Sequence, residues 1–257
     1  AAPVRQLSQS GAQMDHDVNA PVFGEGDAWR VAALSMMGAA ALRAIFSGDP
    51  LQAVPWVTAA ANGGLAEAEV RLGRMLLSGE GVSKDERAAV AWFGRAAEKN
   101  NIDAHNMLGR CYENGWGVAR DFDAAGRPYA IAASAGDAWA QYNLGHLFLD
   151  GLGVPRDVDE AFAWYMRAAR QGHVRAMSLV GRCHEEGWGV AKDTDLARAW
   201  YRKSADGGYF RGAFNYASML VGEGCIACAA HWFEKALAAA PEPTCGNMAA
   251  VLLKSPH

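Results

Sequence analysis

A 36-residue repeat is the feature that most limits how this chain can fold. The pair Leu72-Gly73 recurs 36 residues later at Leu108-Gly109, and again at Leu144-Gly145 and Val180-Gly181. Each repeat continues with Gly-x-Gly-Val, and an aspartate stands three residues after the valine, at Asp85, Asp121, Asp157 and Asp193. Periods of about 20 to 50 residues are typical of arrays in which one small structural unit stacks on the next. The period therefore predicts a repeat protein, and the abundance of alanine predicts that it is helical.

Each repeat has the pattern of two helices. The aspartate precedes an apolar-periodic run, so it is predicted to cap a first helix by accepting hydrogen bonds from free amide groups. The second helix carries Ala104, Met107, Leu108 and Cys111 on its inner face in one repeat, and the paired glycines end it. A glycine also recurs inside each second helix, at Gly73, Gly109, Gly145 and Gly181. Because such a glycine costs about 1 kcal/mol relative to alanine, its recurrence indicates close approach of the next first helix.

These residues resemble the Sel1-like repeat family, a branch of the tetratricopeptide-like α-solenoids. The best copy comprises Ala161, Trp164, Tyr165, Ala168, Ala169, Ala176, Gly181, Gly187, Gly189, Val190 and Asp193. The resemblance covers roughly residues 50–240. It implies an all-α fold, a right-handed superhelical α-solenoid of antiparallel helix pairs whose first helices line the concave side. Two departures are Pro128, which replaces a tryptophan, and a shortened last repeat.

The two ends of the chain differ from the repeats. Residues 1–25 are polar without a helical period, and we expect a flexible or loosely docked tail there. Residues 26–257 are predicted to form one solenoid, with an N-terminal capping helix at 26–49, repeats over 50–240 and a C-terminal cap at 241–257. Caps are expected because each unit of a solenoid buries its core only against its neighbours.

Composition excludes several functional classes. The 257 residues are 51 % hydrophobic, which argues against a disordered chain. The 24 basic and 28 acidic side chains give a formal charge of −4 without a basic block, so neither nucleic acid nor an anionic membrane is expected as the main partner. Every run of 18 residues contains a charge, and we expect no transmembrane segment.

The sequence says little about compartment. The start Ala1-Ala2-Pro3 is compatible with the end left after removal of a signal peptide, which favours a periplasmic or exported protein. The cytoplasm is the alternative, because the five cysteines do not have the placement of a dense disulfide framework.

The sequence does not predict a catalytic site. Acidic pairs such as Asp121 and Asp123 repeat with the period, so they indicate helix caps and solvated surface rather than one carboxylate dyad. The glycine pairs lack the Gly-Lys-Ser/Thr of a phosphate-binding loop. His184-Glu185-Glu186 is interpreted as an exposed helix end. The chain is therefore predicted to be no enzyme and to need no cofactor.

The cysteines leave three alternatives open near the C-terminus. Cys225, Cys228, His231 and Cys245 are a possible zinc set, although their spacing matches no site we can name. A disulfide from Cys245 to either Cys225 or Cys228 would join the C-terminal cap to the last full helix. Free thiols are the third alternative. Cys111 and Cys183 occupy equivalent positions and are predicted to be small core residues.

The resemblance implies a function as well as a fold. It implies a non-catalytic scaffold or adaptor of bacterial type that binds a protein or peptide, in envelope signalling, in host interaction or as an immunity protein that neutralises an effector. A monomer is favoured. The alternative is a small-molecule-binding or hydrolytic enzyme similar to β-lactamase-like members, but the one-disulfide-per-repeat pattern of penicillin-binding relatives is absent here.

Two surfaces are predicted to bind the partner. Outward positions of the first helices vary between repeats, and the candidates there are Arg127, Ile131, Met166, Arg167, Arg170, Arg202 and Lys203. The middle residues of three successive Gly-x-Gly turns are Trp116, Leu152 and Trp188, which we expect to project outward and to form an exposed apolar patch along one edge. The alternatives are that the basic residues merely solvate the first helices, and that each tryptophan folds back over a helix end.

Overall fold

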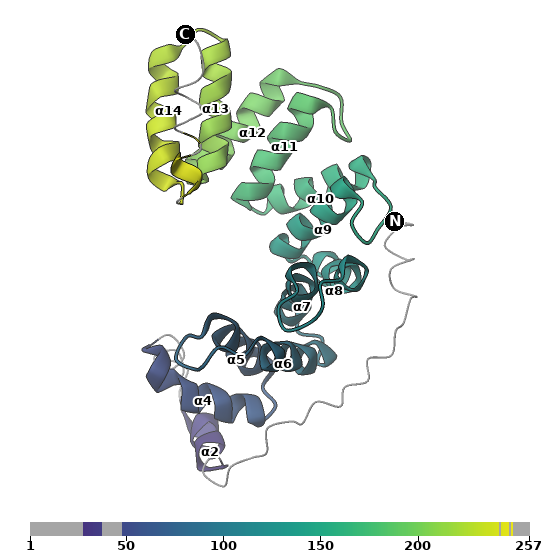
Figure 1. The fold of residues 1–257 in the computed structure, drawn as a ribbon, viewed down its shortest axis with the longest axis vertical. Coiled ribbons are helices and arrows are strands. Elements are labelled where there is room, and N and C mark those ends of the chain that lie inside the picture. Colours follow the sequence, from purple (N-terminus) through teal and green to yellow (C-terminus); the bar gives the residue numbers. More distant parts are fainter. Residues whose placement is uncertain (1–27, 38–47, 242, 247, 249–257) are drawn as a thin grey trace. The chain divides into compact units, whose positions relative to one another are not determined.

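The computed structural model describes residues 28–37, 48–241, 243–246 and 248, and the regular elements in these ranges are all helices (Figure 1). The chain divides into two compact units, Ala1–Asp137 and Ala138–His257, called unit 1 and unit 2 below. Unit 1 contains α2 (Ala28–Met36), α4 (Pro50–Asn62), α5 (Ala66–Ser78), α6 (Glu86–Glu98), α7 (Ile102–Asn114) and α8 (Phe122–Ser134). Unit 2 contains α9 (Ala138–Asp150), α10 (Val158–Arg170), α11 (Val174–Glu186), α12 (Thr194–Asp206), α13 (Phe210–Gly222) and α14 (Ile226–Ala239).

Consecutive helices pack against each other within each unit. In unit 1 the contacts run from α4 through α8, and α2 packs on α4. In unit 2 they run from α9 through α14, and α11 also contacts α13. Short turns connect the helices of a pair, which run antiparallel (Figure 1). The prediction of an all-α solenoid of helix pairs is confirmed, and no helix in the described ranges is long and apolar enough to cross a membrane.

The periodic aspartates cap the first helices, as predicted. Asp85, Asp121 and Asp193 each accept a hydrogen bond at 2.9 to 3.0 Å from the backbone amide three residues later. Asp157 accepts two, from the amides of Asp159 and Glu160. Each cap satisfies amides that the helix cannot pair internally and contributes about 1 kcal/mol. The sequence spacing alone therefore fixes where these helices begin.

The Gly-x-Gly turns have two different physical requirements. The first glycine ends the second helix in the left-handed conformation, with φ of 75° at Gly79 and 78° at Gly187. The second glycine lies against the start of the preceding first helix. A Cβ atom at Gly117 would overlap the carbonyl oxygen of Glu86, and one at Gly189 would overlap that of Val158. The second glycine is thus a packing residue between adjacent repeats.

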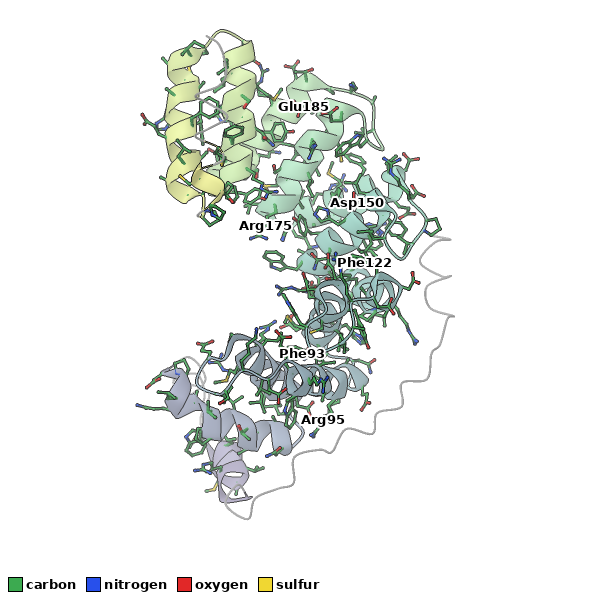
Figure 2. The ribbon with its side chains drawn as sticks, in the orientation of Figure 1. Phe93, Arg95, Phe122, Asp150, Arg175 and Glu185 are labelled. Atoms are coloured by element: carbon green, nitrogen blue, oxygen red, sulfur yellow. A yellow bond between two sulfur atoms is a disulfide. The ribbon has the colours of Figure 1, made fainter. Side chains whose placement is uncertain are left out.

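The glycine inside each second helix faces an aromatic ring of the following first helix. A Cβ atom there would lie between 2.5 and 2.8 Å from the ring of Phe93, Tyr129, Tyr165 or Tyr201. Each of these rings is almost completely buried, and Phe93 is labelled in Figure 2. The predicted close approach is confirmed, and the approaching group is a side chain. Packing a large ring into the space of a missing side chain brings the two helices together without a void.

The buried tyrosines differ in one polar detail. The Tyr129 hydroxyl donates to Glu113 at 2.5 Å, and the Tyr201 hydroxyl donates to Glu185 at 2.5 Å. The residue equivalent to these glutamates beside Tyr165 is Leu149, and the Tyr165 hydroxyl is buried without a hydrogen-bond partner in the described structure. Burial is the main cause that raises the pKa of all three tyrosines.

Most of the predicted terminal segments lie outside the described residues. The tail predicted at residues 1–25 lies outside them entirely, and of the predicted capping helix the structure describes α2. Near the other end, Met248 is buried against Ala205, Ala213 and Ala236. The domain boundaries given above therefore stay predictions.

Candidate partner-binding grooves

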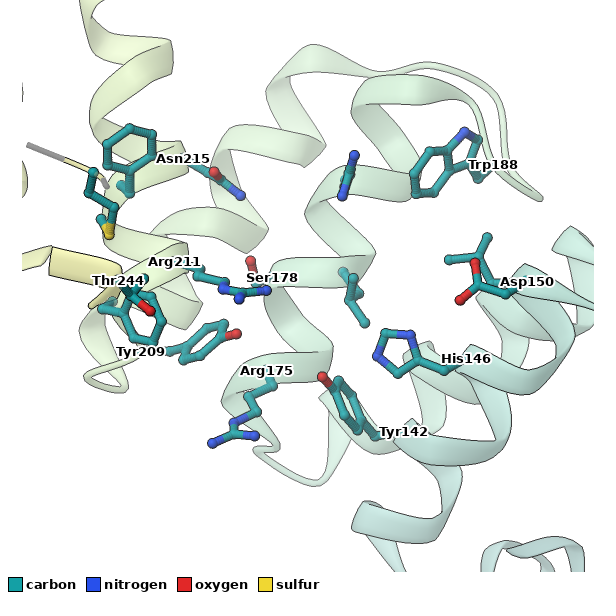
Figure 3. Close-up of a pocket in the computed structure, with 16 residues that line it drawn as sticks. Tyr142, His146, Asp150, Arg175, Ser178, Trp188, Tyr209, Arg211, Asn215 and Thr244 are labelled. Carbon is teal, nitrogen blue, oxygen red and sulfur yellow. The ribbon is translucent and has the colours of Figure 1, made fainter. Parts of the chain in front are cut away.

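Unit 2 contains a groove of about 510 Å³, called the unit 2 groove below (Figure 3). Its walls come from the second helices α9, α11 and α13, with Trp188 from the turn after α11 and Thr244 and Met248 from the C-terminal segment. In Figure 3 the labelled residues of α9 lie on one side of α11, and those of α13 lie on the other.

Helical spacing explains which residues reach the unit 2 groove. On α11 the lining residues are Arg175, Ser178, Leu179 and Arg182, which follow the i, i+3, i+4, i+7 spacing of one helix face. The neighbouring face of the same helix holds Ala176, Val180 and Cys183, which are buried. One face thus builds the core of unit 2 and leaves the other for the groove.

The unit 2 groove combines positive charge with aromatic rings. Arg175, Arg182 and Arg211 line it and are exposed, whereas Asp150 is the single acidic residue among its lining residues. The guanidinium carbon of Arg175 lies 5.2 Å from the ring centre of Trp139 and 5.8 Å from that of Tyr209. Arg182 lies 4.8 Å from the Trp188 ring centre. Stacking on rings leaves the guanidinium hydrogens of an arginine available for a ligand.

Two histidines on the α9 side are held in their neutral form. His146 packs edge-on against Tyr142, with ring centres 4.6 Å apart, and lines the groove. Burial is the main cause that lowers the pKa of His146; Asp150 opposes this shift and Arg211 adds to it. His173, at the start of α11, lies 4.4 Å from Trp139 between ring centres. Burial and then the charge of Arg175 lower the pKa of His173 to about 4.

The His173 pKa predicts acid sensitivity. The Nδ1 atom of His173 accepts the Ala176 amide hydrogen at 3.2 Å, which only an unprotonated nitrogen can do. The unfolded chain, with an ordinary histidine pKa of about 6.5, binds the proton more readily than the folded chain does. This contribution to stability is therefore fully present above about pH 6.5 and is lost as the pH falls towards 4.

The measurement is thermal unfolding followed by circular dichroism from about pH 7 to about pH 5. We expect His173 to account for a loss on the order of 1 kcal/mol, because its partial exposure reduces the full effect. The variant His173→Asn keeps a cap acceptor without a titrating ring. A pH dependence as steep in His173→Asn as in the unsubstituted chain would contradict the assignment.

A smaller groove of about 330 Å³ lies in unit 1. It is also built around second helices, by Arg74 and Leu77 of α5 and Met107 and Arg110 of α7, with Trp116 from the following turn. Here charges are largely paired within the protein. Arg74 forms an ion pair with Asp103 of α7 at 3.2 Å, and Lys84 forms one with Glu86 at 2.8 Å.

Comparison with known families agrees with this architecture. The Sel1 repeat family matches residues 66–101, 102–137, 140–173 and 174–209, which together are more than half of the chain. The chain belongs to the Sel1 repeat family. Among proteins with curated functions, none matches this chain significantly.

Two solved Sel1 repeat structures resemble the chain over most of its length. A Sel1 repeat protein from Oxalobacter formigenes is 28 % identical with a TM-score of 0.70, over 77 % of this chain and 84 % of that one. A protective antigen of uropathogenic Escherichia coli is 29 % identical with a TM-score of 0.68. That match covers 81 % of this chain but 45 % of the antigen, so this chain corresponds to less than half of the antigen's length.

Second helices of this chain supply most of the walls of both grooves, and Glu86 at the start of α6 is the one lining residue from a first helix. That first helices line the concave side of the superhelix stays a prediction. The candidates that line neither of these two grooves are Arg127, Ile131, Met166, Arg167, Arg170, Arg202 and Lys203. Arg167 lies 4.1 Å from the ring centre of Trp164 on its own helix, and Lys203 lies 4.4 Å from that of Trp200. These cations cover tryptophans, while partner binding by the first helices stays a prediction.

The middle residues of the Gly-x-Gly turns do not project outward, contrary to the expectation from sequence. Trp116, Leu152 and Trp188 are all half-buried. The two tryptophans fold back towards the second helix before them, where Arg110 and Arg182 lie over their rings. Trp116 packs against the core of unit 1 and lies 5.1 Å from Arg110, between ring centre and guanidinium carbon. The exposed apolar patch is therefore wrong. Trp116 and Trp188 still line grooves, whereas Leu152 lines neither.

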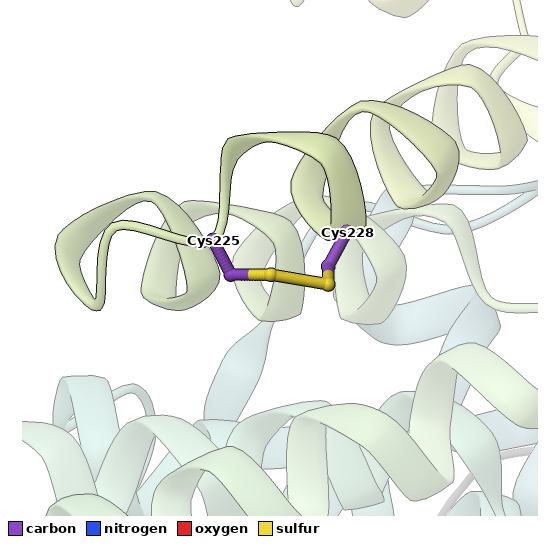
Figure 4. The surroundings of a disulfide bond; sticks show 2 residues. All are labelled: Cys225 and Cys228. Carbon is purple, nitrogen blue, oxygen red and sulfur yellow. A yellow bond between two sulfur atoms is a disulfide. The ribbon is translucent and has the colours of Figure 1, made fainter.

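The C-terminal cysteines pair in a way that the sequence analysis did not consider. Cys225 and Cys228 form a disulfide across the first turn of α14, with Cα atoms 5.4 Å apart (Figure 4). Cys245 is free, so the alternative of a bridge from Cys245 to Cys225 or Cys228 is wrong. The zinc hypothesis finds no support, since the described residues contain no group of three or more potential ligands. Cys111 and Cys183 are buried core thiols as predicted, and burial raises the pKa of each to about 12.

The groove residues were missed because repeat-to-repeat variation was followed only on the first helices. The signal is equally visible on the second helices. One position is successively Glu67, Asp103, Trp139, Arg175 and Arg211, and another is Arg74, Arg110, His146, Arg182 and Ser218. Both positions change within a frame of constant alanine and glycine. Variation of this kind is compatible with a surface that is free to specialise.

Proposed function

We propose that this Sel1 repeat protein is a non-catalytic scaffold that binds a protein or peptide partner in the unit 2 groove. Sel1 repeat proteins are generally protein-interaction scaffolds. The observation that carries the proposal is the composition of the unit 2 groove. Rings and arginines, the residue types most often found at binding hot spots, gather on its walls.

The groove also has the dimensions and setting expected of a recognition site. Its volume of about 510 Å³ accommodates several side chains of an extended segment. Its walls belong to helices whose other faces are fixed by the buried core of unit 2. A binding surface held on rigid elements loses little conformational freedom when it binds.

The biological role of the scaffold depends on which partner it binds, and the groove alone does not identify that partner. Envelope signalling, host interaction and neutralisation of an effector each require a bound protein, and identification of that protein decides between them.

A periplasmic or exported location is supported by the Cys225–Cys228 disulfide, because such bonds persist in oxidising compartments.

The alternative of a hydrolytic enzyme has weaker support. Nucleophilic catalysis needs a hydroxyl or thiol in hydrogen-bond contact with its base. His146 and Asp150 line the unit 2 groove, but within the described residues His146 has no such hydrogen bond.

A steric block tests the proposal without changing any charge. Asn215 lines the unit 2 groove on α13, so Asn215→Trp places an indole inside it. Ser218, one turn further along α13, is exposed outside the groove, and Ser218→Trp is the matched control. Purified chains are used to capture partners from cells with a cross-linker, and captured proteins are identified by mass spectrometry.

We expect the same partner to be captured by the unsubstituted chain and by Ser218→Trp, and to be lost or weakened by about tenfold or more with Asn215→Trp. Circular dichroism checks that both variants stay folded. Equal capture by both variants would place the binding site elsewhere. A further variant, Arg167→Glu with Arg202→Glu, tests the first-helix surface in the same assay, and loss of capture there would favour that surface.

A further inference from the structure

The repeat symmetry reveals an unusual pair of charges in the unit 2 groove. In unit 1, Arg74 on one second helix forms an ion pair with Asp103 on the next. Moving both positions by three periods of 36 residues leads to Arg182 on α11 and Arg211 on α13. Both of these arginines line the unit 2 groove. Where unit 1 has an internal ion pair, unit 2 therefore has two like charges on neighbouring second helices.

Within the described residues, no acidic side chain forms an ion pair with either arginine. Arg175, Arg182 and Arg211 form no ion pair with any residue in the described ranges. His146, which lines the same groove, adds no positive charge at neutral pH because burial lowers its pKa. Like charges that line one groove repel each other, and an external carboxylate bound there reduces that repulsion. The arrangement is thus complementary to an anion.

The aromatic rings near Arg182 and Arg211 indicate which class of anionic ligand the groove binds. Tyr142, Trp188, Tyr209 and Phe214 line the groove together with the arginines. Such rings favour apolar side chains or peptide planes beside the charged group. Asp150 at the Trp188 end opposes a continuous polyanion, and the chain as a whole carries a charge of −4. These features favour an acidic peptide over a nucleic acid.

We infer that the unit 2 groove receives an extended, acidic segment of a partner protein, with an aspartate or glutamate carboxylate held by Arg182 and Arg211. Planar guanidinium groups bind carboxylates through two parallel hydrogen bonds. Apolar side chains of the segment lie on the neighbouring rings, and Asp150 limits how far the negative charge extends. This inference rests on the proposed function and adds the chemistry of the partner.

Selection from a random-peptide library displayed on phage tests it. The full chain, the variant Arg182→Gln with Arg211→Gln, and the control Arg167→Gln with Arg170→Gln are each used as bait. The control removes two arginines from α10, outside the groove. We expect aspartate and glutamate to be enriched with the unsubstituted chain and with the control, and not with the groove variant.

Affinities of one selected peptide provide the second measurement. By fluorescence anisotropy, Arg182→Gln with Arg211→Gln is expected to weaken binding by about tenfold or more, whereas Asp150→Asn is expected to strengthen it by a few-fold. Replacing the acidic residues of the peptide with glutamine or asparagine should match the loss seen in the groove variant. A single-stranded oligonucleotide is the competing probe, and displacement of the peptide by it at equal concentration would overturn the inference.

The outcomes separate this inference from the proposed function. If the selected peptides lack acidic residues but no longer bind to Asn215→Trp, the groove remains the binding site and its acidic specificity is overturned. Peptides that bind equally well to Asn215→Trp would overturn both. Enrichment of acidic residues that persists in the Arg182→Gln with Arg211→Gln variant would assign the charge recognition to other residues and overturn the inference.

Discussion

Gly189→Ala is expected to lower the free energy of unfolding of unit 2 by about 3 kcal/mol or more. Gly189 has φ of 65°, a conformation that costs an L-residue about 1 to 2 kcal/mol. In addition, the new Cβ atom would overlap the carbonyl oxygen of Val158, which is backbone at the start of α10. Backbone cannot rotate away as a flexible side chain does, so two adjacent repeats must separate locally.

A second glycine isolates the contribution of the collision. Gly172 has φ of 90°, but a Cβ atom there meets nothing within 4 Å. Gly172→Ala therefore carries conformational strain alone, and we expect a loss of about 1 to 2 kcal/mol. Thermal and urea unfolding of the two variants measures the difference. Equal losses would show that the approach of the turn to α10 contributes nothing to stability.

Replacing both Arg95 and Lys99 with methionine is expected to destabilise unit 1 by about 3 to 5 kcal/mol. Their shared partner is Glu69, whose side chain is fully buried; it accepts from Lys99 at 2.8 Å and lies 3.2 Å from Arg95. Lys99 also donates to the Gly64 carbonyl at 2.7 Å. Removing the two cations leaves a buried carboxylate without a counter-charge, which costs far more than an exposed ion pair contributes.

The repeat supplies a matched control for this prediction. Arg167 occupies the position of Arg95 two periods later, and the position of Glu69 is there the neutral Gln141, whose side chain accepts from Gln171 at 2.8 Å. Arg167→Met is expected to cost less than about 1 kcal/mol. Adding Glu69→Leu to the double variant should restore most of the lost stability. A triple variant no more stable than the double one would contradict the role assigned to the buried charge.

The outcome for the first helices shows how a basic residue can be misread from sequence. Arg95, Arg167, Lys203 and Lys235 each stand three residues after a tryptophan and lie over its ring. This i, i+3 relation is local and repeats with the period, which is the signature of a structural role. The arginines of the unit 2 groove differ in that the residue type at each position changes along the chain.

The position of His184 within the repeat predicts its burial better than its neighbouring residues do. The expectation of an exposed helix end is wrong for this residue, which is buried and packs against Phe162 with ring centres 5.6 Å apart. Its equivalents in earlier repeats are Leu76, Tyr112 and Phe148. The repeat alone places His184 on a core position, whereas Glu185 and Glu186 beside it are exposed.

The sequence by itself determined the helices, their caps and the contacts inside one repeat. Asp85 and its equivalents cap helices through bonds that span three residues, and the glycine at Gly145 admits the ring of Tyr165 from the adjacent helix. These relations are local, so residue spacing encodes them. Only the tertiary structure decided that second helices form the groove walls, that Trp188 folds back, and that Arg182 and Arg211 meet in one groove. Those results depend on the angle at which successive helix pairs stack and on which helix faces stay open. A period of residue types along the chain does not specify that packing angle.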